Sequence, residues 1–572
     1  MKNILKYMKA YRKECVLGPL FKLLEASFEL MIPLVVARMI DVGISQGNTG
    51  YLIKLCLIMV LLGLVGLISA VTAQYFAAKA AVGFSGKLRE RLMCKLLGLS
   101  CEQMDRLGTA TMITRLTSDI NQVQNGVNLT LRLLLRSPFV VFGAMIMAFT
   151  IDVDAAWIFA AVIAVLCMIV FGIMLITMPI HRRVQEKMDS ITLSVRENLN
   201  GVRVLRAFCK EEAEKKEFSQ KARALEKSQN FVGRISGLMN PVTLVVINLA
   251  VVALIKTGAM KVESGALSQG MVIALYNYMS QILVELIKMA NLIITITKAT
   301  ACGKRVSNIL QIPTQAQGEN QLSDSLWGAV DFCNVSLRYS NAGDVSLEQI
   351  SFHANPGQTV GIIGGTGSGK TTLVNLIAGL YPASEGCVLL DGTDISQWDT
   401  GSLRQQIGVV PQKAVLFSGT IRDNLCWGKK TATDDELWEA LETAQAKEIV
   451  QNKPGELDAT VEQGGMNFSG GQRQRLCIAR ALVRKPGILI MDDSASALDY
   501  ATDARLRHAL RSREDAPTTF IVSQRAASVR YADFILVLDD GRLVGKGSHD
   551  ELMSQCPVYQ EIYYSQFGKE DA

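Results

Sequence analysis

Long apolar runs without charge occupy much of the first half of this 572-residue chain. Three of these runs, Leu55–Ala78, Ala155–Ile180 and Ile235–Ile255, contain no Asp, Glu, Lys or Arg. A helix needs about 20 apolar residues to cross the hydrocarbon core of a bilayer, and each run is long enough to do so. The C-terminal part of the chain, roughly 250 residues, has the mixed polarity of a globular domain. The sequence therefore predicts a membrane part followed by a soluble part.

Three further apolar runs, Cys15–Ile40, Leu133–Ile151 and Ala266–Ile296, contain charged residues. A charge within a span is tolerated where it faces the interior of a helix bundle or a water-filled cavity, so we include these runs and predict six spans. Six of the charged residues in these runs are Lys22, Glu25, Glu29, Arg136, Glu285 and Lys288. They could line an inner cavity that receives amphipathic cations, or they could form ion pairs between helices, and the sequence leaves both alternatives open.

The connections between the runs differ in length and charge. Two of them, Lys79–Arg132 and His181–Arg234, are long and rich in Lys and Arg, and helical periodicity predicts that they project beyond the membrane as helices. Positive charge is enriched on the cytoplasmic side of membrane proteins, so these connections, both termini and the soluble part are predicted to be cytosolic. Residues 1–14 are basic and amphipathic, which is typical of a helix on the inner membrane surface. We predict a multi-pass protein of the cell membrane.

The net charge of +6 does not indicate nucleic-acid binding, because Lys and Arg cluster beside the apolar runs instead of forming a basic stripe. The twelve cysteines include no Cys-x-x-Cys pair. Disulfides are rare in reducing compartments, and these cysteines are predicted to be small hydrophobic residues in such a compartment.

A glycine-rich segment, Gly364–Thr371, lies between the predicted strand Thr359–Ile363 and the predicted helix Thr371–Leu380. This is the context of a phosphate-binding loop, because glycines let backbone N–H groups converge on phosphate and the helix N-terminus adds positive potential. Lys370 is predicted to reach the β and γ phosphates of ATP, and Thr371 to bind Mg²⁺. The predicted ATP-binding residues of this segment are Gly364, Gly365, Thr366, Gly367, Ser368, Gly369, Lys370, Thr371 and Thr372.

A buried strand is predicted at Ile488–Met491 and is followed by Asp492, a carboxylate suited to hold Mg²⁺ at the end of the strand. The predicted fold is an α-helical membrane domain of six transmembrane helices fused to an α/β P-loop nucleotide-binding domain. The predicted boundaries are 1–14 for the interfacial helix, 15–310 for the membrane domain, 311–328 for a linker and 329–572 for the nucleotide-binding domain.

The segment Phe468–Gln472 reads Phe-Ser-Gly-Gly-Gln. It resembles the signature segment of ATP-binding cassette (ABC) proteins, and six spans followed by one cassette is the order of an ABC exporter half-transporter. The resemblance implies that this segment closes over ATP bound to the opposite nucleotide-binding domain, so two such domains are needed. The residues of this trans site are Ser469, Gly470, Gly471 and Gln472.

Other segments are similar to further parts of the family pattern. Tyr339 resembles the aromatic residue that stacks on adenine, Gln412 resembles the glutamine that meets Mg²⁺, and Ser496–Asp499 resembles the segment that crosses the dimer interface. Met104–Gly108 and Arg115–Asp119 resemble the first cytosolic coupling region, and Glu197–Phe208 resembles the second. Solvated helix faces would explain the charges of these segments, but not Gly201 and Phe208 at a turn between helices. The Mg²⁺ ligands that the resemblance implies are Thr371, Gln412 and Asp492.

Two positions depart from the family pattern in the catalytic site. Asp493 stands where the family has a glutamate that orients the attacking water, and Gln524 stands where it has a histidine that contacts the γ-phosphate. A carboxylate that is one methylene shorter is poorly placed, and Gln cannot carry charge. We expect this site to bind ATP and hydrolyse it slowly, as in the degenerate-site subunit of heterodimeric bacterial multidrug ABC exporters, whose partner carries Glu and His. The segment Thr460–Gly465 also departs from the family pattern, which puts coupling through it in doubt.

The resemblance implies an ATP-driven, Mg²⁺-dependent exporter of small hydrophobic or amphipathic compounds that works in the lipid bilayer with a second ABC half-transporter. A lipid or peptide exporter is one alternative, and a regulatory or channel-like membrane protein gated by ATP is another. The spans exclude a soluble ABC ATPase that acts on nucleic acid.

Overall fold

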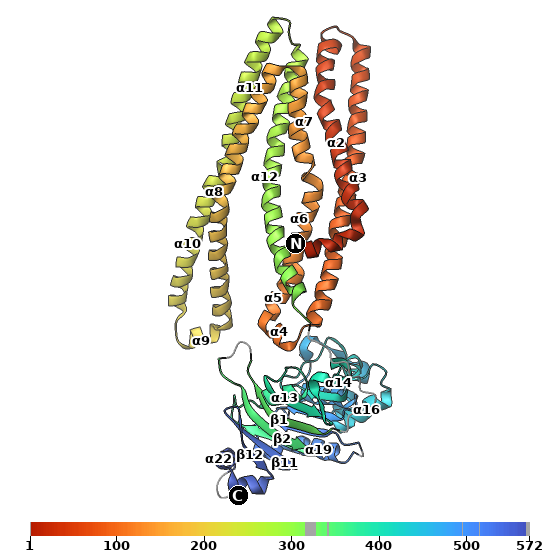
Figure 1. Ribbon diagram of the computed structural model, residues 1–572, viewed down its shortest axis with the longest axis vertical. Helices are drawn as coiled ribbons and strands as arrows, with labels where there is room; N and C mark the ends of the chain where they lie inside the picture. Colours follow the sequence, from red (N-terminus) through yellow and green to blue (C-terminus); the bar gives the residue numbers. More distant parts are fainter. Residues whose placement is uncertain (1, 315–327, 340–342, 495, 514, 568–572) are drawn as a thin grey trace. The chain divides into compact units, whose positions relative to one another are not determined.

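The computed structural model describes residues 2–314, 328–339, 343–494, 496–513 and 515–567, with side chains from residue 4 onward. The chain forms two compact units, one within Met1–Leu97 and Ala110–Ile312, the other within Gly98–Thr109 and Pro313–Ala572. Figure 1 shows helices in the first unit and a mixture of strands and helices in the second. Most of the predicted linker 311–328 lies outside the described residues.

The first unit is built from long helices in the order of the predicted spans (Figure 1). These are α2 (Arg12–Arg38), α3 (Thr49–Leu97), α6 (Ile120–Leu133), α7 (Arg136–Ile151), α8 (Val153–Asn200), α10 (Glu211–Gly237), α11 (Met239–Glu263) and α12 (Gln269–Gln311). Shorter helical segments are α1 (Lys2–Leu5), η1 (Lys6–Tyr11), η2 (Met39–Ile44), α5 (Thr109–Thr114), η3 (Arg115–Asp119) and α9 (Val202–Ala207). The two long polar connections are helical, as the sequence predicts.

Five helical stretches among the described residues are long and apolar enough to cross a membrane. They are Thr49–Leu97, Thr109–Ile151, Val153–Asn200, Glu211–Glu263 and Gln269–Gln311. The first predicted span coincides with α2, which has 27 residues but carries charges within its apolar stretch and is not among the five. The count of six spans is therefore not confirmed.

Small residues allow the helices of this unit to approach closely. Gly126 on α6 faces Ala299 on α12, and a Cβ at Gly126 would lie 2.2 Å from the Cβ of Ala299. Gly270 on α12 faces α2, and a Cβ there would lie 2.3 Å from the carbonyl oxygen of Ala37. Because lipid tails are as apolar as the side chains, close packing of small residues is a main source of helix association in membranes.

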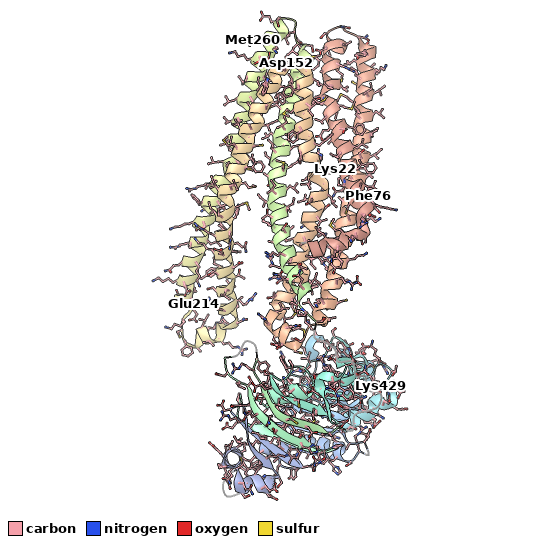
Figure 2. All side chains as sticks on the ribbon, viewed as in Figure 1. Lys22, Phe76, Asp152, Glu214, Met260 and Lys429 are labelled. Carbon is pink, nitrogen blue, oxygen red and sulfur yellow. The ribbon has the colours of Figure 1, made fainter. Side chains whose placement is uncertain are left out.

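A group of charged side chains joins α2, α7 and α12. Arg136 on α7 donates to Glu285 on α12 over 2.5 Å and to Glu29 on α2 over 2.6 Å. Lys288 donates to Glu285 over 2.9 Å, and Lys22, which Figure 2 shows part-way along α2, donates to Glu25 over 2.5 Å. All six charged residues singled out in the sequence thus take part in ion pairs within the unit. The contacts show ion pairs between helices, and Glu29, Glu285 and Lys288 also line a pocket of about 360 Å³, so the inner cavity stays a prediction beside the ion pairs.

The second unit contains two main sheets. The larger has the order β12-β11-β3-β10-β9-β6, and its pairs are parallel except for β12 with β11. The smaller is antiparallel in the order β2-β1-β4-β5, and β7 pairs with β8. The strands are β1 (Val330–Leu337), β2 (Leu347–Ala354), β3 (Thr359–Gly364), β4 (Glu385–Leu390), β5 (Thr393–Asp394), β6 (Ile407–Val410), β7 (Gly419–Thr420), β8 (Thr460–Val461), β9 (Ile488–Asp492), β10 (Thr518–Val522), β11 (Phe534–Asp539) and β12 (Arg542–Gly547).

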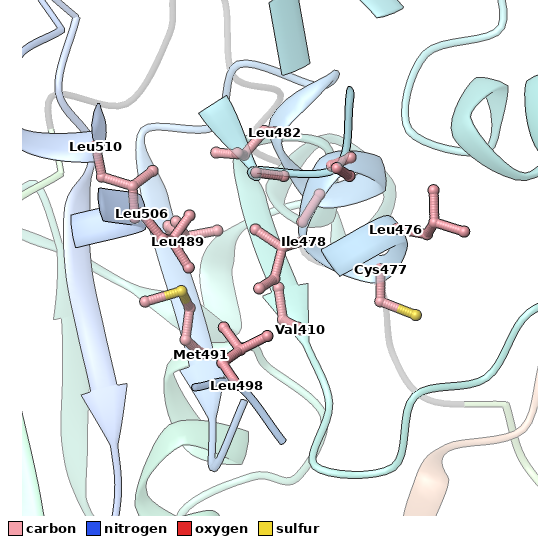
Figure 3. Packing of buried hydrophobic residues seen from close by; sticks show 14 of the residues in the cluster. Val410, Leu476, Cys477, Ile478, Leu482, Leu489, Met491, Leu498, Leu506 and Leu510 are labelled. Carbon is pink, nitrogen blue, oxygen red and sulfur yellow. The ribbon is translucent and has the colours of Figure 1, made fainter. Parts of the chain in front are cut away.

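Helices cover the larger sheet and complete its core. They are α13 (Lys370–Ile377), α14 (Thr400–Gln406), α15 (Ile421–Cys426), α16 (Asp434–Thr443), α17 (Lys447–Gln451), α18 (Gly470–Leu482), α19 (Tyr500–Arg511), α20 (Ala526–Val529), α21 (His549–Gln555) and α22 (Pro557–Gln566). Figure 3 shows Ile478 of α18 near Val410 of β6, and all four residues Val410, Ile478, Leu482 and Met491 belong to one buried cluster. All five residues of β9 are buried, which is typical of a central parallel strand.

Replacing Arg136 with Gln is expected to destabilise the helical unit. Glu285 is 3% exposed, and the variant would leave this carboxylate with Lys288 as its remaining cation. Removing one partner from a buried ion pair costs roughly 3–5 kcal/mol, and Lys288 should keep the loss at the lower end. The melting temperature of the full chain in lipid nanodiscs should fall accordingly.

The matched control is Arg182→Gln, which removes an exposed pair with Glu186. Exposed pairs contribute little, so this variant should melt as the wild type does. Equal melting temperatures for both variants would show that the buried pairs do not hold the helices together.

Candidate nucleotide-binding site

The candidate site lies where five parallel strands end. In the order of the sheet, β11, β3, β10, β9 and β6 run in the same direction, so their carboxyl ends meet at one edge. Open α/β sheets bind ligands at this edge. A pocket of about 500 Å³ opens there and is lined by residues that follow each of the five strands.

The glycine-rich loop connects β3 to α13. Gly367 and Gly369 have φ angles of +85° and +95°, which only glycine adopts freely. A Cβ at Gly369 would also lie 2.8 Å from the carbonyl oxygen of Ser346. Lys370 folds over the loop, and its ammonium group donates to the carbonyl oxygens of Gly364 at 2.9 Å and Gly365 at 2.6 Å. The loop thus has a tight glycine turn with one cation fixed at its centre.

Residues that could hold Mg²⁺ lie beside the loop. The hydroxyl group of Thr371 donates to Asp492 Oδ1 over 3.2 Å, which joins the start of α13 to the end of β9. Gln412 follows β6, and its amide nitrogen lies 3.4 Å from Asp493 Oδ2, which leaves the amide oxygen of Gln412 free for a cation. A carboxylate, a hydroxyl group and an amide oxygen are hard oxygen ligands of the kind that Mg²⁺ prefers, so these residues fit the metal.

Burial controls the charges in this pocket. It raises the pKa of Asp492, and the neighbouring Asp493 raises it further, while the bond from Thr371 and the charge of Lys370 act in the opposite direction. Burial also lowers the pKa of Lys370, although both carboxylates counteract this. A divalent cation beside Asp492 and phosphate beside Lys370 would each add opposite charge that favours the ionised form of the buried group.

Asp493 occupies an unusual backbone position. Its φ angle is +45°, in the left-handed region, where Asp is more common than most other non-glycine residues. Its N–H group donates to the carbonyl oxygen of Val522 over 3.0 Å, and its own carbonyl oxygen accepts a bond from the Ser496 hydroxyl group over 2.7 Å. These bonds fix the direction of the Asp493 side chain, which lines the pocket together with Gln524.

A short helix from elsewhere in the sequence belongs to the same unit as the pocket. Helix α4 (Cys101–Leu107) begins with a capping box formed by Ser100 and Gln103. The side-chain amide of Gln103 donates to the carbonyl oxygen of Pro313 over 3.0 Å. The hydroxyl group of Tyr381 donates to Asp105 on α4. This contact includes the predicted coupling segment Met104–Gly108.

Tyr381 continues this contact toward the nucleotide pocket. Its ring meets the ring of Tyr339 edge-on, with 5.1 Å between the centroids. The hydroxyl group of Tyr339 donates to Thr372 on α13 over 3.3 Å. Asp105, Tyr381, Tyr339 and Thr372 therefore form a continuous chain of contacts from α4 to the first turn after the phosphate-binding loop.

Most of the sequence-predicted residues of this site come together. Those that line the pocket are Thr366, Gly367, Gly369, Lys370, Thr371, Thr372, Gln412, Asp492, Asp493 and Gln524. Gly364, Gly365 and Ser368 lie next to the pocket as partners of Lys370, and Tyr339 lies beside Thr372. The signature residues Ser469, Gly470, Gly471 and Gln472 are not in its lining. The roles of these residues stay predictions.

Sequence reasoning did not find several residues of the site. Asp344, Ser346, Asp540 and Gly541 line the pocket, but no local motif marks them, because they come from segments beside β2 and β11 that the fold brings in. Tyr381 was also missed. A signal was available, since an aromatic residue that follows the P-loop helix is a candidate neighbour of Tyr339, the residue predicted to stack on adenine.

Comparison with known proteins defines the family. Residues 15–286 match the family described as ABC transporter transmembrane region, and residues 347–496 match the family described as ABC transporter. An uncharacterized ABC transporter ATP-binding protein of Mycobacterium tuberculosis is 36% identical over 569 residues, which cover 98% of this chain and 97% of the relative. The chain belongs to the ABC transporter family.

Its fold is that of an ABC exporter half-transporter. A solved structure of a bacterial Atm1-family ABC exporter with ATP bound is similar to it with a TM-score of 0.81 and 23% identity, covering 98% of this chain and 99% of that chain. The Bacillus subtilis relative named putative multidrug export ATP-binding/permease protein YgaD is 28% identical over 580 residues, 98% of each chain. The ATP-dependent lipid A-core flippase of Hahella chejuensis is 29% identical over 525 residues, 91% of this chain and 89% of the relative.

The segment Ser469–Gln472, which resembles the ABC signature, lies at the start of helix α18. Ser469 is the N-cap residue, its hydroxyl group accepts a bond from the N–H group of Gln472 over 3.3 Å, and the Gln472 side chain accepts one from the N–H group of Ser469 over 3.0 Å. Ser469 and Gly470 are exposed, and a Cβ at Gly470 would meet no atom within 4 Å. This helix N-terminus therefore presents its positive end to the surface, away from the pocket of its own chain.

Replacing Asp492 with Asn is expected to stabilise the chain without nucleotide and to abolish the stabilisation by Mg-ATP. A carboxyl group whose folded pKa is raised opposes folding at neutral pH, and this effect disappears as the pH falls below the pKa of the unfolded chain. In a chelator, the variant should melt at a higher temperature than the wild type at neutral pH, and the difference should shrink as the pH is lowered. Scanning calorimetry of the full chain with and without Mg-ATP measures both effects.

The control for this prediction is Asp423→Asn. Hydrogen bonds from Thr420 lower the pKa of Asp423, so here the charged form favours folding and neutralisation should lower the melting temperature. A decrease for Asp492→Asn in chelator would contradict the raised pKa of that carboxyl group.

Proposed function

We propose that this ABC exporter subunit binds ATP at its own nucleotide site, hydrolyses it slowly there, and forms its competent site with a different chain. The observation that carries the proposal is the presence of Asp493 and Gln524 together in the pocket of Lys370, Thr371 and Asp492. The binding elements are thus intact, whereas both positions that the family uses on the attacking water and the γ-phosphate are changed.

The geometry around Asp493 supports slow cleavage. Phosphoryl transfer depends mainly on positioning and electrostatic stabilisation, so a carboxylate must reach the attacking water. Asp493 is short, its backbone is fixed by the bond to Val522, and its Oδ2 lies 3.4 Å from the amide of Gln412. Gln524 can donate a hydrogen bond but carries no charge. Two weakened contributions in one site should lower the rate more than either alone.

The exposed signature segment supports the need for a partner. Ser469–Gln472 retains the glycines and the capping box that orient backbone N–H groups at the start of α18, yet it does not line the pocket of its own chain. Half-transporters of this family work in pairs, and the intact segment would complete a site whose Glu and His belong to the partner. We propose a heterodimer in the cell membrane, with the termini in the cytosol.

We further propose that the transported compounds are hydrophobic or amphipathic. The wide apolar surface of the spans suits compounds that enter from the bilayer, and the name of the relative YgaD points to multidrug export. The lipid A-core flippase is a relative of similar identity, so lipid transfer is the second candidate.

Coupling is proposed to include the contact between α4 and Tyr381. Tyr381 contacts both Asp105 on α4 and Tyr339, the residue predicted to stack on adenine. Any movement of Tyr339 would therefore change the packing of Tyr381 against α4. The coupling segment that the sequence predicts would then respond to the nucleotide directly.

Repairing the catalytic positions should increase ATP hydrolysis. The full chain alone in lipid nanodiscs is expected to hydrolyse Mg-ATP near background, and the double variant Asp493→Glu, Gln524→His should gain at least about tenfold, because positioning and charge at the γ-phosphate are restored. A phosphate-release assay measures the rates.

The matched control makes the same exchanges outside the pocket, at the exposed residues Asp435 and Gln397, as Asp435→Glu, Gln397→His. It should remain at the wild-type rate. Robust hydrolysis by the wild-type chain alone would reject the heterodimer with one weak site and make this subunit a homodimeric pump.

Replacing Tyr381 with Phe should weaken coupling but preserve ATP binding. The variant loses the hydroxyl group that donates to Asp105, while the ring that packs on Tyr339 remains. In the repaired background, the amphipathic cation tetraphenylphosphonium should stimulate ATP hydrolysis, and Tyr381→Phe should reduce this stimulation without changing the affinity for ATP.

Tyr531→Phe is the control, since Tyr531 is 63% exposed and lies outside the contact chain. Stimulation that survives in Tyr381→Phe would contradict the proposed coupling contact. Stimulation of the repaired chain by added lipid A and not by the cation would favour the lipid exporter over the multidrug exporter.

A further inference from the structure

Two cysteines face each other in the smaller sheet. In the antiparallel pair of β1 and β4, Cys333 lies directly opposite Cys387. Side chains directly opposite each other project from the same face of the sheet. The neighbouring pair, Phe332 with Val388, is buried on the other face, which places the two thiols on the outer face. The fold thus creates a dithiol from residues that lie far apart in the sequence.

The backbones of β1 and β4 approach each other closely beside this dithiol. The register of β1 and β4 shifts just after Cys333, where Asn334 has a φ angle of +48°. Gly386, next to Cys387, has a φ angle of +75°, and a Cβ there would lie 2.4 Å from the carbonyl oxygen of Cys333. Opposed residues of antiparallel strands have Cα atoms about 4.5–5.5 Å apart, within the range of about 4.4–6.8 Å that a disulfide needs. The two strands can therefore be joined without a large movement.

The two thiols differ in accessibility. Cys333 is exposed, and Cys387 is partly buried. Burial raises the pKa of the Cys387 thiol, and the adjacent Cys333 and the carboxylate of Asp394 raise it further. Attack on an incoming disulfide depends on access and on the thiolate fraction, so Cys333 is the first to react and Cys387 is the resolving thiol.

We propose that Cys333 and Cys387 form a reversible thiol–disulfide site that takes low-molecular-weight disulfides such as oxidised glutathione. The Cys333 thiolate attacks one sulfur of the glutathione disulfide, forms a mixed disulfide and releases one glutathione thiolate. The Cys387 thiolate then attacks the Cys333 sulfur and releases the second glutathione. The two cysteines are oxidised to one disulfide, the glutathione disulfide is reduced to two thiols, and the two cysteine protons pass to the released thiolates. In a reducing compartment, such a bond forms transiently and reports the redox state.

This site is connected to the nucleotide pocket through the two strands that it would join. Two residues beyond β1 lies Tyr339, and four residues before β4 lies Tyr381. The strand ends between them are held together by the N–H group of Ser384, which donates to the carbonyl oxygen of Ser336 over 2.8 Å. A disulfide would restrict the movement of the ends of β1 and β4, and with it the closing of Tyr339 on the adenine base of ATP. Oxidation should therefore weaken ATP binding. The inference does not depend on which compound is exported.

The test uses the full chain in lipid nanodiscs treated with oxidised glutathione. Peptide mapping by mass spectrometry should find the peptides of Cys333 and Cys387 joined, with the loss of two hydrogen atoms. A titration with a fluorescent ATP analogue should show affinity lowered by about fivefold, at the small end of the range for coupled sites, and restored by dithiothreitol.

Single variants separate this site from the other cysteines. Cys333→Ser and Cys387→Ser should each bind ATP as the reduced wild type does and lose the oxidative effect, and Cys387→Ser should retain glutathione on Cys333. The control variants Cys94→Ser and Cys209→Ser, at two other exposed cysteines, should form the cross-link normally. Glutathione that stays on Cys333 in the wild type would overturn the proposal. A cross-link with unchanged ATP affinity would overturn its connection to the nucleotide pocket.

Discussion

The parallel pairing of β3 with its neighbours is the constraint on which the nucleotide site depends. The register aligns Val522 of β10 with both Ile362 of β3 and Asp492 of β9, so the segments that follow these strands leave the sheet at the same level. The glycine-rich loop, the carboxylate of Asp492 and Gln524 are therefore neighbours without any direct sequence relation. The buried apolar strands supply the free energy that holds these polar groups together, since a fully buried aliphatic side chain contributes about 1.5–3 kcal/mol.

The same arrangement explains why binding and cleavage can be separated. Lys370 and Thr371 are fixed by the loop and by α13, whereas Asp493 and Gln524 follow other strands and affect the site through their own side chains. A sequence can therefore lose the groups proposed to act on the attacking water while it keeps the loop and the helix start that are proposed to bind the nucleotide. A pair of unequal sites in a heterodimer is a natural outcome of this independence.

Much of the site could be predicted because its chemistry is local in the sequence. The glycine loop and the strand ending at Asp492 each occupy a few consecutive residues, and the structure places them on the predicted strands and at the start of the predicted helix. Contacts between distant segments could not be predicted. Arg136 and Glu285 are 149 residues apart, and nothing in either run indicates that they pair. The six predicted spans illustrate the same difficulty, because length and polarity alone support five and the partner of Glu29 on α2 lies 107 residues away.

The grouping of α4 with the nucleotide-binding unit has a consequence for how this chain can be divided. The boundary drawn from the sequence at residue 329 separates a membrane part from a soluble part, but the compact soluble unit also contains Gly98–Thr109. A fragment that starts at the boundary would leave the hydroxyl group of Tyr381 without Asp105 and would uncover the surface on which α4 packs. The excised domain lacks contacts that the same residues make within the whole chain, so stability and nucleotide affinity measured on the fragment describe the fragment alone.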